Sequence, residues 1–220
     1  SAVCMDKDVS KRLLQAEGIP AAKSCTIRTP EDLGYHEAVA ALGTPLFVKP
    51  AREGSSLGVS KVRNAEQYAQ ALRTAFALDR KVLVEEAVAG REIECAVLGN
   101  AHPEAAPVLG EIAPRHEFYS YEAKYVDENG AELIVPAPVD PEIAEQIRAT
   151  AVQAFKTTAC RGMARVDFFL CEDNSFVLNE LNTLPGFTNI SMYPRLWIAS
   201  EVPYPELLDR LIALALETQR

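Results

Sequence analysis

The sequence predicts an α+β fold, and two patterns support that prediction. Apolar runs on either side of a turn predict one strand hairpin at residues 46–62 and another at 165–182. Apolar residues repeating every three to four positions predict amphipathic helices around these hairpins. At 220 residues, 48% of them hydrophobic, the chain can bury one large core or two modest ones.

The chain is predicted to open with a helix. Val9, Leu13 and Leu14 repeat at helical spacing, and Gly18 marks the end of the pattern. The sequence starts at Ser1 without an initiator methionine and runs almost directly into this helix. We therefore expect a fragment that has lost an N-terminal portion.

The first hairpin holds a glycine-rich loop. A buried strand at Leu46–Pro50 contains Lys49, the loop covers 53–58, and a second strand is expected at 59–62. The loop is not a Walker A sequence, and a Gly-Ser-Ser turn alone is more often structural than phosphate-binding. Together with Lys7 and Lys49, it could supply the amides and point charges that grip a triphosphate. Taken singly, each lysine is most simply interpreted as a solvated surface charge.

A helix and two strands are predicted next. Asn64 stands at the N-cap and Gln67 at the capping-box position of a helix. The apolar positions expected to face the core in this helix are Tyr68, Leu72, Ala75 and Phe76. Strands are expected at Val82–Glu86 and, beyond Gly90, at 92–98, so this first portion of the chain is α+β.

The remainder alternates between regular elements and one long loop. A strand is expected at 108–112, a helix opening at Pro141 and a closing helix at 207–216. The helix face predicted to be buried carries Ile143, Ile147, Ala151 and Phe155. Residues 114–131 lack clean periodicity and are rich in aromatic and basic side chains, namely Phe118, Tyr119, Tyr121, Lys124 and Tyr125. A loop that long in a compact domain is usually disordered or functional, and we interpret it as a lid.

Composition narrows the classes of function. A formal net charge of −9 offers no basic field for a polynucleotide, which argues against a nucleic-acid partner. The odd number of cysteines, without C-x-x-C spacing, predicts reduced core thiols in a cytosolic protein. No signal peptide or membrane-spanning run is found. The scattered His36, His102 and His116 lack metal-ligand spacing and are expected on the surface.

Candidate metal ligands gather in the second hairpin. Asp167 is predicted on one strand, and Glu180 and Asn182 on a shared face of the other. Two carboxylates and an amide, with no histidine or cysteine nearby, suit Mg²⁺, which keeps positions free for water and substrate phosphates. The alternative is that these are ordinary edge-strand charges. Their position inside apolar strands beside Arg165 favours a site, because unpaired charge there would be costly.

Six motifs occur in the order in which one known family has them. They are Met5-Asp6-Lys7, Val48-Lys49-Pro50, the loop 53–59, Tyr121-Glu122-Ala123-Lys124-Tyr125, Arg165-Val166-Asp167, and the string 179–188 that reads NELNTLPGFT. In these motifs the sequence resembles the D-alanine–D-alanine ligases, ATP-grasp enzymes of peptidoglycan synthesis and cell-wall biogenesis. The resemblance covers essentially the whole chain. It implies two α+β subdomains that sandwich ATP, a central one at 1–85 and a C-terminal one at 86–220 with the metal site and the lid.

The resemblance also implies the roles of single residues. It assigns the nucleotide to Lys7, Lys49, Ser56, Glu92, Phe118, Phe169 and the segment Glu85, Glu86, Ala87 and Val88, whose backbone would read the adenine edge. It assigns two Mg²⁺ or Mn²⁺ ions to Asp167, Glu180 and Asn182. It assigns catalysis to Arg165, Ser55, Tyr125 and Lys124, and the second D-alanine to Gly186, Ser191 and Met192.

The implied reaction is the ligation of two D-alanines. One carboxylate attacks the γ-phosphoryl group of ATP, and a second D-alanine then displaces phosphate from the acylphosphate, so the protein's task is charge neutralisation and positioning. In the family a preceding domain supplies a glutamate that completes a network with Ser55 and Tyr125, and we expect this chain to lack that domain. We therefore expect weak ATP binding and inefficient ligation by this chain alone, and a homodimer only in the full-length enzyme.

Two alternatives stay open. One is a non-catalytic module that senses ATP, against which Arg165, Tyr125 and Ser191 argue, because they have work to do only when an amino acid is present. The other is an ATP-grasp ligase for another D-amino or D-hydroxy acid.

Overall fold

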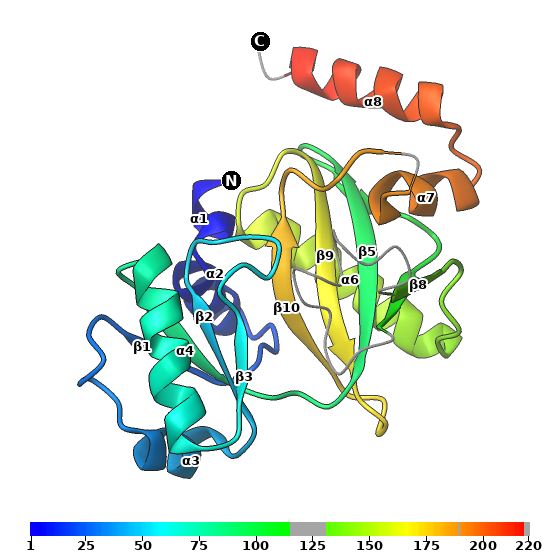
Figure 1. The fold of residues 1–220 in the computed structure, drawn as a ribbon. Helices are drawn as coiled ribbons and strands as arrows, with labels where there is room; N and C mark the ends of the chain where they lie inside the picture. The colour runs from blue at the N-terminus through cyan, green and yellow to red at the C-terminus, as the bar shows by residue number, and fades with distance from the viewer. Residues whose placement is uncertain (115–130, 189, 218–220) are drawn as a thin grey trace.

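The fold is α+β, as predicted, and contains two antiparallel sheets. The structure is a computed structural model that describes residues 1–114, 131–188 and 190–217. The smaller sheet consists of β1 (Ser24–Ile27), β2 (Leu46–Pro50), β3 (Ser60–Val62) and β4 (Val82–Glu86), in the order β1-β4-β2-β3. Figure 1 shows it beside the larger sheet, with the chain crossing from β4 to the first strand of that sheet.

The larger sheet has six strands. Its order is β10-β9-β5-β7-β8, with the short β6 pairing β5. The strands are β5 (Arg91–Gly99), β6 (Glu104–Ala105), β7 (Gly110–Pro114), β8 (Ala131–Ile134), β9 (Gly162–Leu170) and β10 (Phe176–Asn182). The predicted hairpin of residues 165–182 is the β9-β10 pair, whose turn falls at 171–175.

Alternation along β2 and β4 divides the smaller sheet into an apolar and a charged face. Leu46, Val48 and Val84 pack into a core with α4 (Ala65–Leu78) and α3 (Tyr35–Leu42). Lys49 and Glu85 have the opposite parity in the same two strands and therefore point away from α4. The smaller sheet thus turns its charged face away from its own helices.

The start of α4 follows the predicted capping pattern with one difference. The Asn64 side chain accepts a hydrogen bond from the Gln67 N–H at 2.9 Å. The Gln67 side chain accepts from the Arg63 N–H at 2.8 Å, one residue before the N-cap that a capping box would use. Of the predicted core positions, Tyr68, Leu72 and Ala75 are buried, whereas Phe76 is half-buried.

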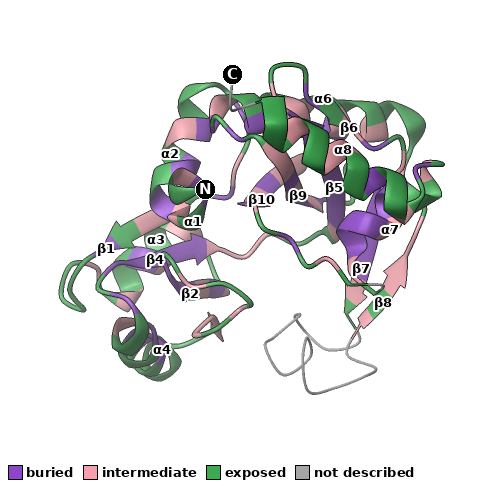
Figure 2. Cartoon of the chain, turned by 90° about the horizontal axis from the view of Figure 1, so that it is seen from above, coloured by how far each residue is buried: buried purple, intermediate pink, exposed green. Residues whose placement is uncertain are grey.

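One face of the larger sheet forms the main core. Ile93 and Val97 of β5 pack with Val166 and Phe168 of β9 against α6 (Pro141–Thr157). As predicted, α6 buries Ile147, Ala151 and Phe155, and Ile143 packs at the edge. In Figure 2 the buried residues of β5, β7 and β9 lie beneath helices whose outer faces are exposed.

The first two helices belong to the core of the larger sheet. Cys4 of α1 (Ala2–Met5) and Leu14 of α2 (Lys7–Ala16) are buried in the same cluster as Phe155 and Phe168. Beyond α2, the Leu178 N–H of β10 donates to the Pro20 carbonyl at 2.8 Å. The chain therefore starts against the larger sheet before it builds the smaller one.

The last two helices cover one end of the other face of the larger sheet. Ala96 and Leu98 of β5 pack with Trp197 of α7 (Met192–Ala199) and Leu207 of α8 (Tyr204–Glu217). The remaining part of this face, at the other end of β5 and β9, is left for polar side chains.

Some predicted boundaries shift, and some elements were missed. The strand expected at 108–112 is β7, two residues later, and the closing helix starts at Tyr204 instead of 207. Pro114 and Ala131 pair with each other in β7 and β8, so the lid can cover at most residues 115–130, which lie outside the described residues. The elements that were not predicted are α1, β1, α3, β6 and β8.

The cysteines and histidines agree in part with expectation. The thiols of Cys4, Cys95 and Cys160 are buried and free, whereas Cys25 and Cys171 are free and half-buried. His36 and His102 are exposed, and His116 lies outside the described residues. In the described ranges, no helix has the length and apolarity needed to cross a membrane.

Candidate functional site

The predicted metal ligands lie together on the polar face of β9 and β10. Asp167 stands opposite Glu180 in the register. The Asn182 amide donates to Asp167 Oδ2 at 2.8 Å and to Glu180 Oε1 at 3.4 Å. The three side chains therefore form one polar cluster.

A β-bulge between Leu178 and Glu180 places Glu180 in this cluster. Leu178 is paired with Phe168 and points into the core, so strict alternation would send Glu180 into the core as well. The register shift adds one residue and brings Glu180 opposite Asp167. Such bulges re-aim side chains beside functional sites.

Arg165 ties two buried carboxylates together. Its guanidinium donates to both oxygens of Asp167, each at 2.8 Å, and its Nε lies 3.1 Å from Glu94 Oε1. Burial alone would lower the Arg165 pKa, but Asp167 and Glu94 outweigh it and hold that pKa well above its usual value. Glu94 is fully buried, at 0% exposed, and was missed by the sequence reasoning. Its signal was a carboxylate two positions after Glu92, within the apolar run of β5.

Three carboxylates of β5 and β9 form an oxygen-rich group that could hold a divalent cation. One oxygen from each of Glu92, Glu94 and Asp167 lies within 4.8 Å of the others. Hard oxygen donors of this kind suit Mg²⁺ or Mn²⁺. Asn182 would have to turn its amide oxygen toward a cation, since its nitrogen faces the carboxylates here. The oxygen donors suit the predicted metal, but only Asp167 belongs both to this group and to the predicted ligand set.

Lys7 joins three segments at the edge of this cluster. It is the first residue of α2, and its ammonium donates to the Glu53 carbonyl at 2.6 Å and lies 3.8 Å from Glu180 Oε2. Burial lowers the Lys7 pKa, the charge of Glu180 opposes the shift, and Lys49 adds to it. The structure thus brings a predicted phosphate lysine to the predicted metal ligands and the glycine-rich loop.

The second predicted phosphate lysine lies in a buried cluster of charges. Lys49 Nζ is 2.5 Å from Glu85 Oε2, and Lys11 Nζ is 3.0 Å from Glu85 Oε1 in an ion pair without hydrogen-bond alignment. Burial alone would raise the Glu85 pKa, but Lys49 and Lys11 outweigh it and bring that pKa below its usual value. The sequence reasoning gave Glu85 only a backbone role and missed Lys11. Lys11 could have been found from its spacing of four residues from Lys7, which puts both lysines on one face of the helix.

The segment predicted to read the adenine edge begins at the end of β4. The Glu86 N–H donates to the Lys23 carbonyl at 3.1 Å, and the Glu86 side chain accepts from the Lys23 N–H at 2.7 Å. Ala87 and Val88 follow as half-buried residues outside the strand. On the facing part of the larger sheet, Phe169 stands directly opposite Glu92.

The predicted loop and substrate residues lie in two separate turns. Ser55 and Ser56 both adopt left-handed backbone conformations, with φ of 54° and 57°. Ser191 is the N-cap of α7, and its Oγ accepts from the Thr188 N–H at 3.0 Å. A Cβ on Gly186 would lie 2.8 Å from that oxygen, so only glycine fits there without rearrangement.

Met192 is the first residue of α7, and its side chain packs on Gly110, so only its backbone could face a substrate. Phe118, Lys124 and Tyr125 lie outside the described residues.

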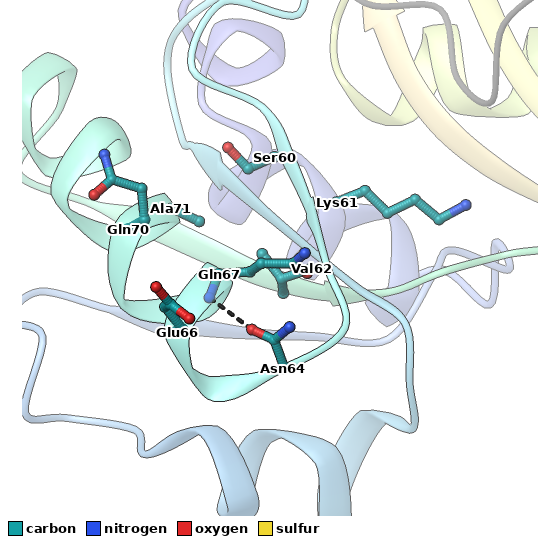
Figure 3. A pocket seen from close by; sticks show the side chains of 8 residues that line it. All are labelled: Ser60, Lys61, Val62, Asn64, Glu66, Gln67, Gln70 and Ala71. Atoms are coloured by element: carbon teal, nitrogen blue, oxygen red, sulfur yellow. Dashed lines mark hydrogen bonds between the residues drawn. The ribbon is translucent and has the colours of Figure 1, made fainter.

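A hollow elsewhere on the surface is not part of this site. It has a volume of about 530 Å³ and lies along β3 and the start of α4. Figure 3 shows its lining, in which Asn64 bonds to Gln67 and the Lys61 side chain extends away from them. It shares no residue with the charged clusters described above.

The two sheets and the charged face between them are those of ATP-grasp proteins, and comparison with known proteins identifies the family. A family model described as "D-ala D-ala ligase C-terminus" matches residues 13–213. The chain belongs to this family. It is 57% identical over 219 residues to D-alanine–D-alanine ligase A of Salmonella typhimurium and 56% identical to that of Escherichia coli K12.

Solved structures agree with this assignment. The D-alanine–D-alanine ligase of Coxiella burnetii superposes with a TM-score of 0.86 at 40% identity, covering 99% of this chain and 58% of that one. The VanG D-Ala:D-Ser ligase of Enterococcus faecalis superposes with a TM-score of 0.88 at 37% identity, covering 97% and 62%. The match includes 99% of this chain but only 60% of the length of the Salmonella and E. coli relatives.

Proposed function

We propose that this chain carries the ATP-binding and acyl-transfer part of a D-alanine–D-alanine ligase. The proposal rests above all on one observation: Arg165 is held by two buried carboxylates on the face where Asp167, Glu180 and Asn182 meet. A guanidinium fixed beside hard-cation ligands suits a reaction in which negative charge develops on a phosphoryl group and then on an acyl carbon.

Each part of the site has a task in this reaction. The loop at Ser55 and Ser56 covers the triphosphate, while Lys7 and Lys49 neutralise it. Arg165 stabilises the oxyanion formed when the second amine attacks the acylphosphate. Ser191 and the α7 N-terminus orient the carboxylate of the second D-alanine, and Gly186 leaves room for it.

The nucleotide is proposed to lie between the two sheets. Its adenine faces the backbone of Ala87 and Val88, its ribose faces Glu92, and Phe169 packs against the base. Phe118, Lys124 and Tyr125 of the lid complete the site. The division into a central subdomain at 1–85 and a C-terminal one at 86–220 stays a proposal, in which α1 and α2 of the first part pack on the sheet of the second.

Asp167, Glu180 and Asn182 are proposed to hold two Mg²⁺ or Mn²⁺ ions. Bound there, the cations would neutralise phosphate oxygens. The chain's own contribution is to keep these ligands within contact of one another and of Lys7 through the bulge and the β9-β10 register. We place the enzyme in the cytoplasm, with D-alanine and ATP as its small-molecule substrates and a homodimer of the longer enzyme as its assembly.

The closeness of the ligase A relatives favours D-alanine as the second substrate. The fold alone does not discriminate, because the VanG D-Ala:D-Ser ligase superposes slightly better than the D-alanine–D-alanine ligase of Coxiella burnetii. The support for D-alanine comes from the ligase A relatives of Salmonella typhimurium and Escherichia coli K12, which are 57% and 56% identical to this chain.

Two measurements on the chain test the proposal. Calorimetry should show Mg²⁺-dependent binding of ATP. Phosphate release from ATP should rise with D-alanine more than with D-serine or D-lactate, but only slowly, and D-alanyl-D-alanine should form inefficiently, as expected for this chain alone. Binding of ATP with no response to any of the three acids would favour the sensing module, and absence of Mg²⁺-dependent ATP binding would refute both readings.

A further inference from the structure

The charged cluster on β2 and β4 contains one more lysine than the proposed phosphate contacts require. Lys11 is 2% exposed, Lys49 is 8% exposed and Glu85 is 4% exposed. Lys11 reaches the cluster from α2, whereas the other two residues come from the neighbouring strands. Burying an ammonium is costly, so a second lysine on one carboxylate calls for a physical reason.

Counting charges supplies that reason. Lys49 and Glu85 alone would form a closed ion pair at 2.5 Å with no net charge. Lys11 binds the other oxygen of the same carboxylate at 3.0 Å, and the three groups together carry a net charge of +1. Two ammonium groups then share the Glu85 carboxylate. The positive charge of Lys49 is therefore only partly neutralised and can attract a second anion.

The location of Lys11 fits this role. It lies one helical turn after Lys7, which already contacts the glycine-rich loop and Glu180. Its ammonium also donates to the Ala22 carbonyl at 3.4 Å, and it contacts Oε1 of Glu85, whereas Lys49 contacts Oε2. Lys11 is thus held by Glu85 and Ala22 and is more deeply buried than Lys49.

We propose that Lys11 is a positioning residue that acts through Glu85: by sharing that carboxylate, it leaves the ammonium of Lys49 available to the phosphates of ATP and oriented toward them. This inference rests on the proposed function. It assigns a role to a side chain that touches neither the nucleotide nor the metal ligands. It also assigns the Glu85 side chain a role separate from that of its backbone.

The test compares Mg²⁺-ATP affinity in four forms of the chain. Lys11→Met should weaken ATP binding by about 10- to 100-fold, the usual range for losing one charge-assisted contact. Glu85→Gln introduced into Lys11→Met removes the competing carboxylate and restores the net charge of +1, so the double variant should regain affinity to within about fivefold of the unmodified chain. Arg12→Met is the matched control, because it removes the same charge from the next residue of α2, where the side chain is 71% exposed.

The outcomes separate the inference from the proposed function. Equal affinities for Lys11→Met and Arg12→Met would overturn the inference, as would a double variant that binds no better than Lys11→Met. A chain that does not bind Mg²⁺-ATP in its unmodified form would overturn the proposed function and the inference together. If Lys11→Met does not fold, as judged by circular dichroism, Lys11→Gln keeps a donor to Glu85 without the charge and should show the same loss and the same recovery.

Discussion

Replacing Arg165 with methionine should destabilise the chain strongly, because two buried carboxylates would lose their partner. Asp167 is 1% exposed and Glu94 is 0% exposed, and the guanidinium contacts both at 2.8 to 3.1 Å. Removing one partner of a buried ion pair costs about 3–5 kcal/mol. Total stabilities are typically about 5–15 kcal/mol, so this loss would be a large fraction of the whole.

Urea unfolding measures this loss directly. With a denaturant slope of about 2–3 kcal/mol per M for a chain of this size, the midpoint of Arg165→Met in EDTA should fall by roughly 1–2 M. Added Mg²⁺ should restore part of the stability, because a cation bound to the folded state alone stabilises it by mass action. It would replace the missing positive charge beside Asp167.

The matched control is Arg210→Met. Arg210 is paired with Glu206 on the surface of α8 with 39% of its side chain exposed, and exposed pairs contribute only about 0–1 kcal/mol. If Arg165→Met loses no more stability than Arg210→Met, the buried triad does not contribute the expected stabilisation of about 3–5 kcal/mol. A loss that Mg²⁺ leaves unchanged would separate the stability argument from the proposed metal site.

Three further predictions follow from single contacts. Hydrogen bonds from Arg52 lower the Asp79 pKa, so the stability they provide is present above about pH 4 and is lost as the pH falls through the folded-state pKa. The melting temperature of Asp79→Asn should therefore fall less steeply on acidification than that of the unmodified chain. Gly90→Ala would place a Cβ 2.8 Å from the Leu170 carbonyl oxygen and should cost about 1–3 kcal/mol in thermal unfolding. Asp167→Asn should weaken Mn²⁺ binding, followed by paramagnetic relaxation, by about tenfold or more.

Much of the fold follows from local pattern alone. The hairpins at 46–62 and 165–182 and the helix at 141–157 have clear apolar periodicity and punctuation by glycine or proline, and the structure contains all of them. The strands β1 and β8 have only four residues each, and no periodic pattern distinguishes so short a segment from a loop. They are strands because a neighbouring strand supplies their hydrogen bonds, which a local pattern does not reveal.

The candidate site was likewise predictable only in part. Asp167, Glu180 and Asn182 could be grouped from the sequence, yet strict alternation after Leu178 would have turned Glu180 into the core. The bulge that prevents this is a property of the strand pair. Glu94 and Lys11 were missed because the role of each depends on an ion pair with a residue far along the chain. Glu94 is paired with Arg165, and Lys11 is paired with Glu85.

The helix α2 fixes the distance between charged side chains on the two sheets. Its Leu14 is buried in the core of the larger sheet, whereas Lys7 and Lys11 extend from one face of the helix to Glu180 and Glu85. Lys81 holds its first turn to the smaller sheet through two ion pairs, at 2.6 Å to Asp6 and 3.0 Å to Asp8. Since one rigid helix carries both lysines, the distance between the acidic cluster of β9-β10 and the charged cluster of β2-β4 depends on how α2 packs. The geometry proposed to receive a triphosphate is therefore set by a helix that packs in the core of the larger sheet and is tied to the smaller sheet by Lys81.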